Sequence, residues 1–213
     1  MHDIRFIEGI AAPLPIDNLD TDQIMPKQFL TGITKAGLDQ GVLYDLRFEP
    51  DGTPKPDFIL NRRAYRDAKI LVAGPNFGCG SSREHAVWGL QQFGIEVVIA
   101  SSFGEIFFGN ALNNRLLLIV LDQQQIDVLL TEISSPSDNR LSVDLEKMQV
   151  HGANGHAYPF TLGARHRQMI THGLDMVGAT LRQMEEIVAF EEGHFSRNPW
   201  LQVLRKTPVP AAD

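Results

Sequence analysis

The sequence predicts an α/β fold with a parallel or mixed central sheet. Three short runs of continuous apolar residues, 70–73, 97–100 and 116–121, are each followed by a segment with helical patterning. Such runs are typical of strands that helices cover on both faces of a sheet. The 213-residue chain shows no internal repeat and no linker, so we expect one domain over residues 1–213.

The segment before the first apolar run is predicted to be mostly irregular. Residues 3–8 suit a short opening strand, and the prolines that follow exclude helix there. Residues 17–30 are dense in acids and amides and suit a polar loop that caps a short helix near 26–31. Alternating aspartates also occur in calcium loops, but the glycine and the closing acid of that motif are missing. Residues 32–58 hold four glycines and three prolines, and predict a partly mobile excursion of the kind that forms binding loops or lids.

The remaining elements follow from periodicity and turn signals. Residues 141–160 alternate and contain Asn154-Gly155, which predicts a hairpin that could extend into a second small sheet. Helices are expected at 61–67, at 104–113 with Ser101 or Ser102 as its cap, at 123–131, at 164–172 and at 175–190. The last stretch, 196–213, contains three prolines and is predicted to be a peripheral tail.

Composition and charge exclude several classes of function. A net charge of −7 without a Lys/Arg block makes the chain a poor candidate for binding nucleic acid or an anionic membrane. Cys79 is the only cysteine, so the chain can form no intrachain disulfide, and one thiol cannot hold an iron–sulfur cluster or a structural zinc. The histidines lack ligand spacing, and no metal site is expected. No secretory leader or membrane span is visible, which predicts a cytoplasmic protein.

Residues 76–86, Asn-Phe-Gly-Cys-Gly-Ser-Ser-Arg-Glu-His-Ala, are the strongest candidate for a functional site. They lie between an apolar run and a helical segment, and Gly78 and Gly80 permit positive φ and close approach to a ligand. Ser81 and Glu84 have the spacing of a capping box, which predicts a helix that begins at about Arg83. The N–H groups and the dipole of its first turn would suit a carboxylate or a phosphate.

A purely structural interpretation of this turn competes with the functional one. Glycine and serine often do no more than cap a helix. The Lys-Ser/Thr pair of a Walker A loop and the dinucleotide pattern G-x-G-x-x-G are both absent. Ser81 could act as a base in a positive environment, but its oxygen cannot serve both a cap and a substrate. Cys79 fits either a reactive thiol or an inert one, and His85 either a structural residue or a general base.

The motifs together resemble a known family. Residues 76–86 are similar to the signature Gly-x-Gly-Ser-Ser-Arg-Glu-His-Ala of the swivel domain in the aconitase superfamily. Residues 17–30, residues 41–48 and the later Arg-His-Arg-Gln at 165–168 resemble the stand-alone form of that domain, in the family of isopropylmalate dehydratase small subunits. The resemblance extends from about residue 5 to about residue 192. It implies a swivelling β/β/α domain with an extra hairpin and C-terminal helices.

The resemblance also implies a reaction. Members of this family are hydro-lyase subunits of leucine biosynthesis that convert 2-isopropylmalate to 3-isopropylmalate through isopropylmaleate. They work with a separate large subunit that carries a four-iron, four-sulfur cluster as Lewis acid, in a hetero-oligomer. Carried over by position, Ser81 is the catalytic base, and Ser82 and Arg83 bind the substrate carboxylate. Asp22 and Lys27 are expected at the mouth of the site.

Two other functions remain open at this point. Related hydratase small subunits act on homoaconitate or citraconate, whose variable arm is not isopropyl. The family places a loop over this arm, expected here within Thr31 to Phe48, and the apolar side chains of that segment favour isopropyl (Leu43, Tyr44, Leu46 and Phe48). The third possibility is a non-catalytic module that uses the glycine turn only to bind a carboxylate.

Overall fold

A computed structural model describes residues 4–30 and 35–206, without the side chains of residues 203–206. Its internal contacts divide the chain into two compact units, Met1–Asp175 and Met176–Asp213. The expectation of a single domain stays a prediction.

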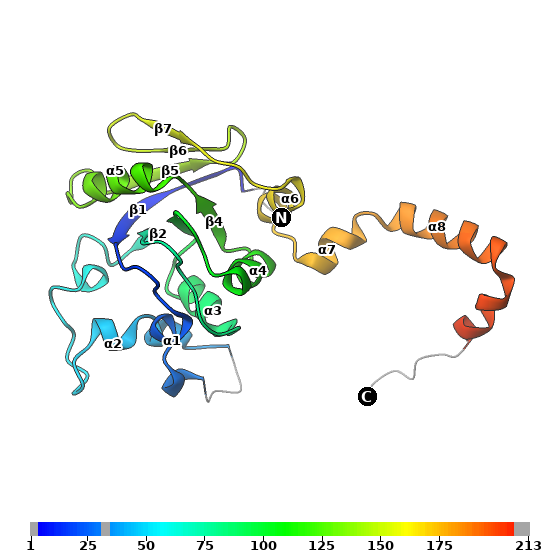
Figure 1. Ribbon diagram of the computed structural model, residues 1–213, viewed down its shortest axis with the longest axis horizontal. Coiled ribbons are helices and arrows are strands. Elements are labelled where there is room, and N and C mark those ends of the chain that lie inside the picture. Colours follow the sequence, from blue (N-terminus) through cyan, green and yellow to red (C-terminus); the bar gives the residue numbers. More distant parts are fainter. Residues whose placement is uncertain (1–3, 31–34, 207–213) are drawn as a thin grey trace. The chain divides into compact units, whose positions relative to one another are not determined.

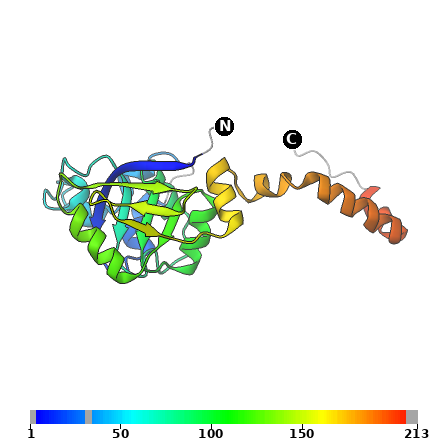
Figure 2. The ribbon, with the colours of Figure 1, turned by 90° about the horizontal axis from the view of Figure 1, so that it is seen from above.

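The first unit is built on a seven-stranded mixed sheet in the order β4-β3-β2-β1-β5-β6-β7 (Figure 1). Neighbours among the first four strands of this order pair in parallel, and the others pair antiparallel. The predicted α/β fold is confirmed. The predicted hairpin exists, but its strands extend the same sheet beside β1 instead of forming a second one (Figure 2). The strands are β1 (Phe6–Leu14), β2 (Ala68–Ala73), β3 (Val97–Ala100), β4 (Leu117–Val120), β5 (Arg140–Asp144), β6 (Gln149–His151) and β7 (Ala157–Pro159).

Both faces of the sheet are covered, as the continuous apolar runs predict. Alternate residues of a strand point to opposite faces. Leu71 and Ala73 belong to a core formed with α3 (His85–Gln92) and α4 (Glu105–Asn113). Ile70 and Val72 belong to a second core formed with α5 (Gln123–Ile133). The β2-α3-β3-α4-β4 order places successive loops at one edge of the parallel strands.

Strand β1 continues through Pro13, beyond the predicted 3–8 segment. Proline lacks the N–H that a central strand needs, so its position requires an explanation. Ala11 donates its N–H to Asn139 O on the β5 side at 2.7 Å. The N–H of residue 13 would point to that same side, where β1 no longer pairs with β5 because their register ends at Ile10. The missing donor therefore costs no ladder bond.

The excursion between β1 and β2 is irregular but packed. Its described residues form α1 (Thr21–Ile24), α2 (Tyr44–Arg47) and three 3₁₀ turns, η1 (Lys27–Phe29), η2 (Leu38–Gly41) and η3 (Ile59–Asn61). The helix predicted near 26–31 is only the η1 turn, and the helix predicted at 61–67 is wrong. The guanidinium of Arg47 donates to Val42 O at 3.0 Å, and its burial lowers the Arg47 pKa against the opposing effect of Asp39. The N–H of Leu38 donates to Gln92 Oε1 of α3 at 3.0 Å, which holds this part of the excursion to the core.

The C-terminal helices divide between the two units. Helix α6 (Ala164–His172) has its predicted bounds and ends at Gly173, whose φ is +63°. The second unit holds α7 (Met176–Leu181), α8 (Met184–Arg197) and the 3₁₀ segment η4 (Pro199–Lys206). The predicted single helix at 175–190 is thus broken after Leu181, and the expected tail is helical through Lys206. No helix among the described residues is long and apolar enough to cross a membrane.

Candidate active site

The glycine turn, residues 74–84, connects the carboxyl end of β2 to α3. The loops that follow β1 and β3 flank it, because these strands are the two neighbours of β2. A parallel bridge joins Asp20 to Cys79, and another joins Phe77 to Phe103. Ligands of open α/β sheets bind outside the carboxyl ends of the strands. The turn therefore lies at the edge of the sheet where a binding site is expected.

The first half of the turn, residues 76–80, is bonded to the loop after β1; we call it the tied half. Gly78 donates its N–H to Leu19 O at 2.7 Å, and Thr21 donates its N–H to Cys79 O at 2.9 Å. The Cys79 thiol donates to Asn18 O at 3.3 Å. These bonds fix the backbone of the tied half against a segment about 60 residues earlier in the chain.

The loop after β3 holds the other side of the tied half. Gly104 donates its N–H to the carbonyl of the buried Phe77 at 2.9 Å. Asn76 donates its N–H to Ser102 Oγ at 2.8 Å. The predicted cap of α4 by Ser101 or Ser102 is therefore wrong, because Gly104 is the N-cap residue and Ser102 serves the turn instead.

Two glycines in the turn are required by its geometry. Gly78 has a φ of +74°, and a Cβ atom at this position would collide with the ring of Phe107. Gly80 has a φ of +93°, but a Cβ atom there would lie 3.5 Å from Asp20 Cβ, an ordinary contact. Gly78 is therefore required for both conformation and space, and Gly80 for conformation alone.

Ser81 lies just past the tied half and does not cap α3. The helix begins at His85, two residues later than predicted, and its N-cap residue Glu84 makes no side-chain cap. The Ser81 hydroxyl lies 3.1 Å from the hydroxyl of Thr21. The predicted capping box is wrong because a partner distant in sequence binds Ser81, so the cap and the substrate do not compete for its oxygen.

Glu84, the other member of the predicted capping box, is bound by α4. Its carboxylate accepts a hydrogen bond from Asn114 Nδ2 at 2.6 Å. Asn114 Oδ1 in turn accepts from the indole N–H of Trp88 at 2.8 Å. This chain of bonds fixes the start of α3 against the end of α4.

Ser82 and Arg83 complete the exposed half of the turn, which we define as residues 81–83. Ser82 is exposed, and its carbonyl accepts from Asn110 Nδ2 at 3.2 Å. Arg83 forms an ion pair with Asp22 through Nη1 and Oδ1. These two atoms are shielded from solvent, and they form an ion pair without an aligned hydrogen bond. The Asp22 side chain as a whole is 44% exposed. The structure thus brings Ser81, Ser82, Arg83 and Asp22 together.

Lys27 is the one predicted site residue that the structure does not join to the others. It lies in the η1 turn, just after α1, which carries Asp22. Its side chain is exposed and has no hydrogen bond or ion pair with the described residues. Its role at the mouth of the site stays a prediction.

Cys79 and His85 have structural contacts that bear on the alternatives left open above. The Cys79 thiol is half-buried, and its hydrogen bond to Asn18 O belongs to the tied half. The His85 ring lies 4.8 Å from the ring of Trp88 on the next turn of α3. Cys79 therefore supports the backbone of the turn, while the His85 ring packs within α3.

The apolar segment expected to face the substrate is only partly available for that role. Leu43 is fully buried in the core and donates its N–H to Ile24 O at 2.9 Å, so its assignment to a substrate-covering loop is wrong. Tyr44, Leu46 and Phe48 are half-buried, with the Tyr44 and Phe48 rings stacked 4.7 Å apart. Thr31, the expected start of this segment, lies outside the described residues.

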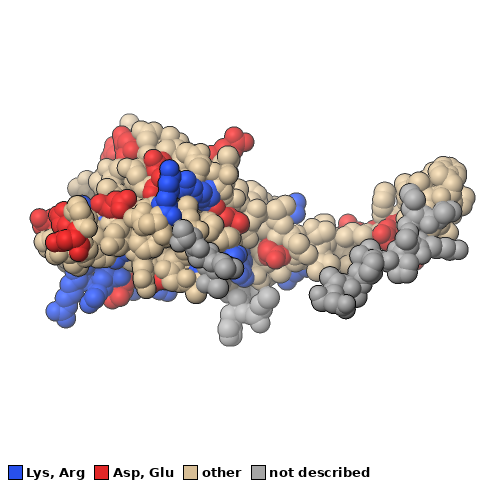
Figure 3. All heavy atoms as spheres, turned by 90° about the horizontal axis from the view of Figure 1, so that it is seen from below, with Lys and Arg blue, Asp and Glu red and all other residues tan. Residues whose placement is uncertain are grey.

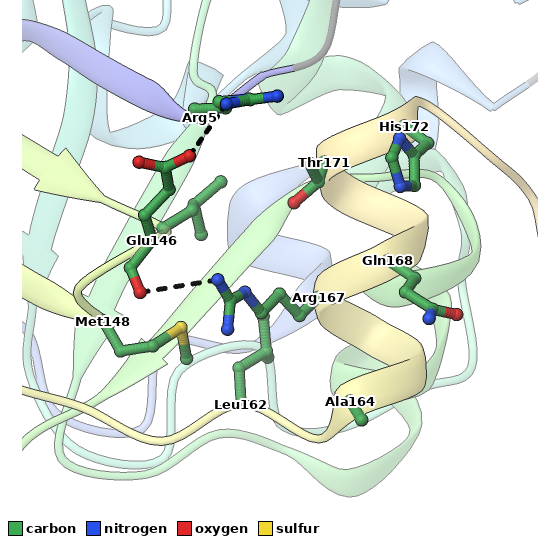
Figure 4. Close-up of a pocket in the computed structure, with 10 residues that line it drawn as sticks. Arg5, Glu146, Met148, Leu162, Ala164, Arg167, Gln168, Thr171 and His172 are labelled. Atoms are coloured by element: carbon green, nitrogen blue, oxygen red, sulfur yellow. Dashed lines mark hydrogen bonds and ion pairs between the residues drawn. The ribbon is translucent and has the colours of Figure 1, made fainter.

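The Arg-His-Arg-Gln motif at 165–168 lies at a different place from the turn. Arg167 and Gln168 of α6 line a cavity of about 530 Å³ that also includes the turn between β5 and β6 (Figure 4). At its rim Arg5 pairs with Glu146 at 3.0 Å, and Arg167 donates to Glu146 O at 3.4 Å. No residue of the glycine turn lines this cavity.

The residues that sequence reasoning missed are the ones that hold the turn from elsewhere, chiefly Thr21, Asn110 and Asn114. A signal for α1 was present, because Asp20 and Gln23 form a capping box in which the Asp20 carboxylate accepts from Gln23 N at 2.7 Å. That pattern would have started a helix at Thr21. Nothing local reveals that α1 packs against the turn.

The chain does not fit an iron–sulfur cluster of its own. Such clusters are held by several cysteine thiolates, and the sequence has one cysteine. Among the described residues no three His, Cys, Asp or Glu side chains gather as a metal site. Figure 3 shows acidic and basic side chains interspersed on the face where α1 and α2 lie in Figure 1. An anion approaching this face meets individual cations instead of a broad basic surface.

Two family models match different parts of the chain. The first, described as the aconitase C-terminal domain, matches residues 1–124 and thus includes the glycine turn. The second, described as the C-terminal domain of the 3-isopropylmalate dehydratase small subunit, matches residues 176–203, which lie in the second unit.

Similar proteins cover nearly the whole chain. A 3-isopropylmalate dehydratase small subunit from Chromobacterium violaceum is 57% identical over 92% of both chains, and one from Mannheimia succiniciproducens is 49% identical over 95% of this chain and 100% of its own. A crystal structure titled 3-isopropylmalate dehydratase, from Methanocaldococcus jannaschii, matches with a TM-score of 0.62 and 28% identity over 87% of this chain and 99% of its own. The chain therefore belongs to the family of 3-isopropylmalate dehydratase small subunits, within the aconitase superfamily.

Proposed function

We propose that this protein is the small subunit of a 3-isopropylmalate dehydratase, which interconverts 2-isopropylmalate and 3-isopropylmalate through isopropylmaleate. The observation that carries the proposal is the exposed half of the turn, where a serine hydroxyl and an arginine follow a fixed backbone in a chain of this family. The enzyme would act in the cytoplasm, in leucine biosynthesis.

Arg83 and Ser82 suit the substrate carboxylate. A guanidinium carries five N–H donors in a planar fork, and carboxylates bind such a fork through two bonds. Asp22 engages Nη1, so other donors of the fork remain to meet a substrate. The Ser82 hydroxyl adds a neutral donor on an exposed residue.

Ser81 suits the proton transfer. In the dehydration direction its oxygen takes the proton from the carbon next to the bound carboxylate, and the C–H electron pair becomes the new C=C bond. The hydroxyl group leaves the adjacent carbon with its own bonding pair, and hydration reverses these steps. A positioned base of this kind contributes about 10²- to 10⁴-fold to a rate.

The remaining chemistry belongs to a partner. Because this chain does not fit an iron–sulfur cluster, we place the Lewis acid for the departing hydroxyl on a cluster-bearing large subunit. The small subunit alone would then bind and orient a dicarboxylate without turning it over.

Reconstitution tests the proposal. The chain is purified alone and together with a 3-isopropylmalate dehydratase large subunit, and formation of the C=C bond is followed by ultraviolet absorbance with 2-isopropylmalate, homocitrate or citramalate. Each subunit alone is the control. We expect turnover only in the mixture and fastest with 2-isopropylmalate. Turnover of homocitrate or citramalate but not of 2-isopropylmalate would assign a related hydratase. Dicarboxylate binding without turnover in any mixture would indicate a non-catalytic module.

A further inference from the structure

Thr21 is bonded to the proposed base through both the backbone and the side chain. Its Oγ1 accepts the N–H of Ser81 at 3.1 Å, and it lies 3.1 Å from Ser81 Oγ and 3.3 Å from Ser81 O. Thr21 is 1% exposed, so its hydroxyl is shielded from water, whereas Ser81 is exposed on the side that would face a substrate. One buried hydroxyl thus contacts three atoms of the same residue, 60 positions later in the sequence.

The available protons decide how this contact operates when Ser81 acts as a base. A hydroxyl has a single proton to donate and lone pairs that accept. The Thr21 oxygen already accepts the Ser81 N–H, so its own proton can go to Ser81 Oγ or to Ser81 O. A deprotonated Ser81 can only accept, and the hydrogen bond to a charged oxygen is the stronger one. The Thr21 proton then goes to Ser81 Oγ.

We propose that Thr21 is a positioning residue whose hydroxyl orients Ser81 and stabilises its deprotonated, base form. This inference rests on the proposed function, in which Ser81 takes the substrate proton. Thr21 itself gains and loses no proton: the substrate proton passes from carbon to Ser81 Oγ, while the Thr21 O–H remains a donor to that atom.

The capping box of α1 explains why Thr21 can be held so closely. Asp20 caps the helix, and Asp20 and Cys79 form the parallel bridge that sets the two segments side by side. Thr21 N donates to Cys79 O at 2.9 Å, so the Thr21 backbone is fixed independently of its side chain. The rotamer therefore needs little reorganisation to reach Ser81.

The test compares Thr21→Val, Thr21→Ser and the control Thr131→Val in the reconstituted enzyme, by the pH dependence of kcat/KM. The control removes a hydroxyl that donates to Asp127 O within α5. Thr21→Val should lower kcat/KM at neutral pH about tenfold or more and move the rising limb about one pH unit higher, as expected from losing one hydrogen bond to a charged oxygen. Thr21→Ser and Thr131→Val should keep the wild-type profile.

A double-mutant cycle separates positioning from packing. On a Ser81→Ala background, Thr21→Val should cause no further loss of activity, because the two residues act as a unit. Equal losses in Thr21→Val and Thr21→Ser, an unshifted pH limb, or an additive loss on the Ser81→Ala background would overturn the inference. If Thr21→Val does not fold, as a thermal melt of each subunit would show, Thr21→Ser and Thr21→Cys decide: Ser must keep the profile and Cys must shift it.

The wild-type arm keeps the two proposals distinguishable. Wild-type turnover of 2-isopropylmalate that is lost in Ser81→Ala, combined with an unchanged Thr21→Val profile, overturns only the role of Thr21. Absence of wild-type turnover, or full activity of Ser81→Ala, overturns the proposed function or its base, and the role of Thr21 with it.

Discussion

The two halves of the glycine turn differ in what holds them. The tied half, residues 76–80, is bonded on both sides to the loops after β1 and β3, and it contains the buried Phe77 and Gly78. The exposed half, residues 81–83, has two exposed serines and a half-buried arginine that is paired with Asp22. The difference teaches that structural and chemical roles are divided between the two halves. The tied half fixes the backbone, and the exposed half presents the side chains that would meet a substrate.

Among changes in the two halves, Arg83→Gln in the exposed half is expected to have the largest effect on activity. The change removes the cation that we assign to the substrate carboxylate, and it leaves Asp22 without its partner. The kcat/KM of the reconstituted enzyme should fall by about 10²-fold or more, as for loss of a preorganised electrostatic contact. Thermal unfolding should change by only about 0–1 kcal/mol, because the Asp22 side chain as a whole is 44% exposed and its carboxylate can be hydrated once Arg83 is gone. A small change in kcat/KM with a large loss of stability would show that Arg83 has a structural role instead of a substrate-binding one.

Gly78→Ala tests the tied half. The added methyl group would meet the Phe107 ring at a φ of +74°, so both overpacking and backbone strain oppose folding. We expect the free energy of unfolding to fall by about 2–4 kcal/mol, measured by urea denaturation. An unchanged midpoint would mean that the tied half is not held as described.

Gly80→Ala is the matched change at the boundary of the two halves. Its φ of +93° strains a non-glycine residue, but the added Cβ finds an ordinary contact with Asp20. The expected loss of stability is about 1–2 kcal/mol, because only the strain applies. The same urea titration ranks it against Gly78→Ala, and the reverse order would contradict the steric role given to Phe107.

Cys79→Ala should have the smallest effect. It removes a weak thiol hydrogen bond to Asn18 O, worth about 0.5–1.5 kcal/mol or less, in the tied half. Activity of the reconstituted enzyme should remain near that of wild type. A loss of kcat/KM of about tenfold or more, which corresponds to about 1.4 kcal/mol, would instead indicate that the thiol takes part in the chemistry.

Local patterns predicted the scaffold and the supports that lie within the turn itself. The apolar runs at 70–73, 97–100 and 116–121 became β2, β3 and β4, because continuous burial on two faces leaves a direct mark on the sequence. Gly78 and Gly80 adopt the positive φ that glycine permits. Both signals depend on a few neighbouring residues.

Contacts between distant segments could not be predicted in the same way. Ser81 was expected to cap α3, but its partner Thr21 lies 60 positions away, and only the pairing of β1 with β2 brings them together. Leu43 was expected near the substrate because an apolar residue in a loop looks the same whether it faces a ligand or the core. The structure buries it. Whether such a residue faces the core or a ligand depends on tertiary packing, and the periodicity of the sequence does not indicate it.

The central claim is that the exposed half of the turn carries the base, and Ser81→Ala tests it most directly. Its Oγ is the one atom removed, while the bond from Ser81 N to Thr21 Oγ1 can persist. The reconstituted variant should bind isopropylmalate with near wild-type affinity and lose about 10²- to 10⁴-fold in kcat, in both the hydration and dehydration directions. Exchange of the substrate C–H proton with solvent deuterium should slow by the same factor. Turnover and exchange at near wild-type rates would contradict the account.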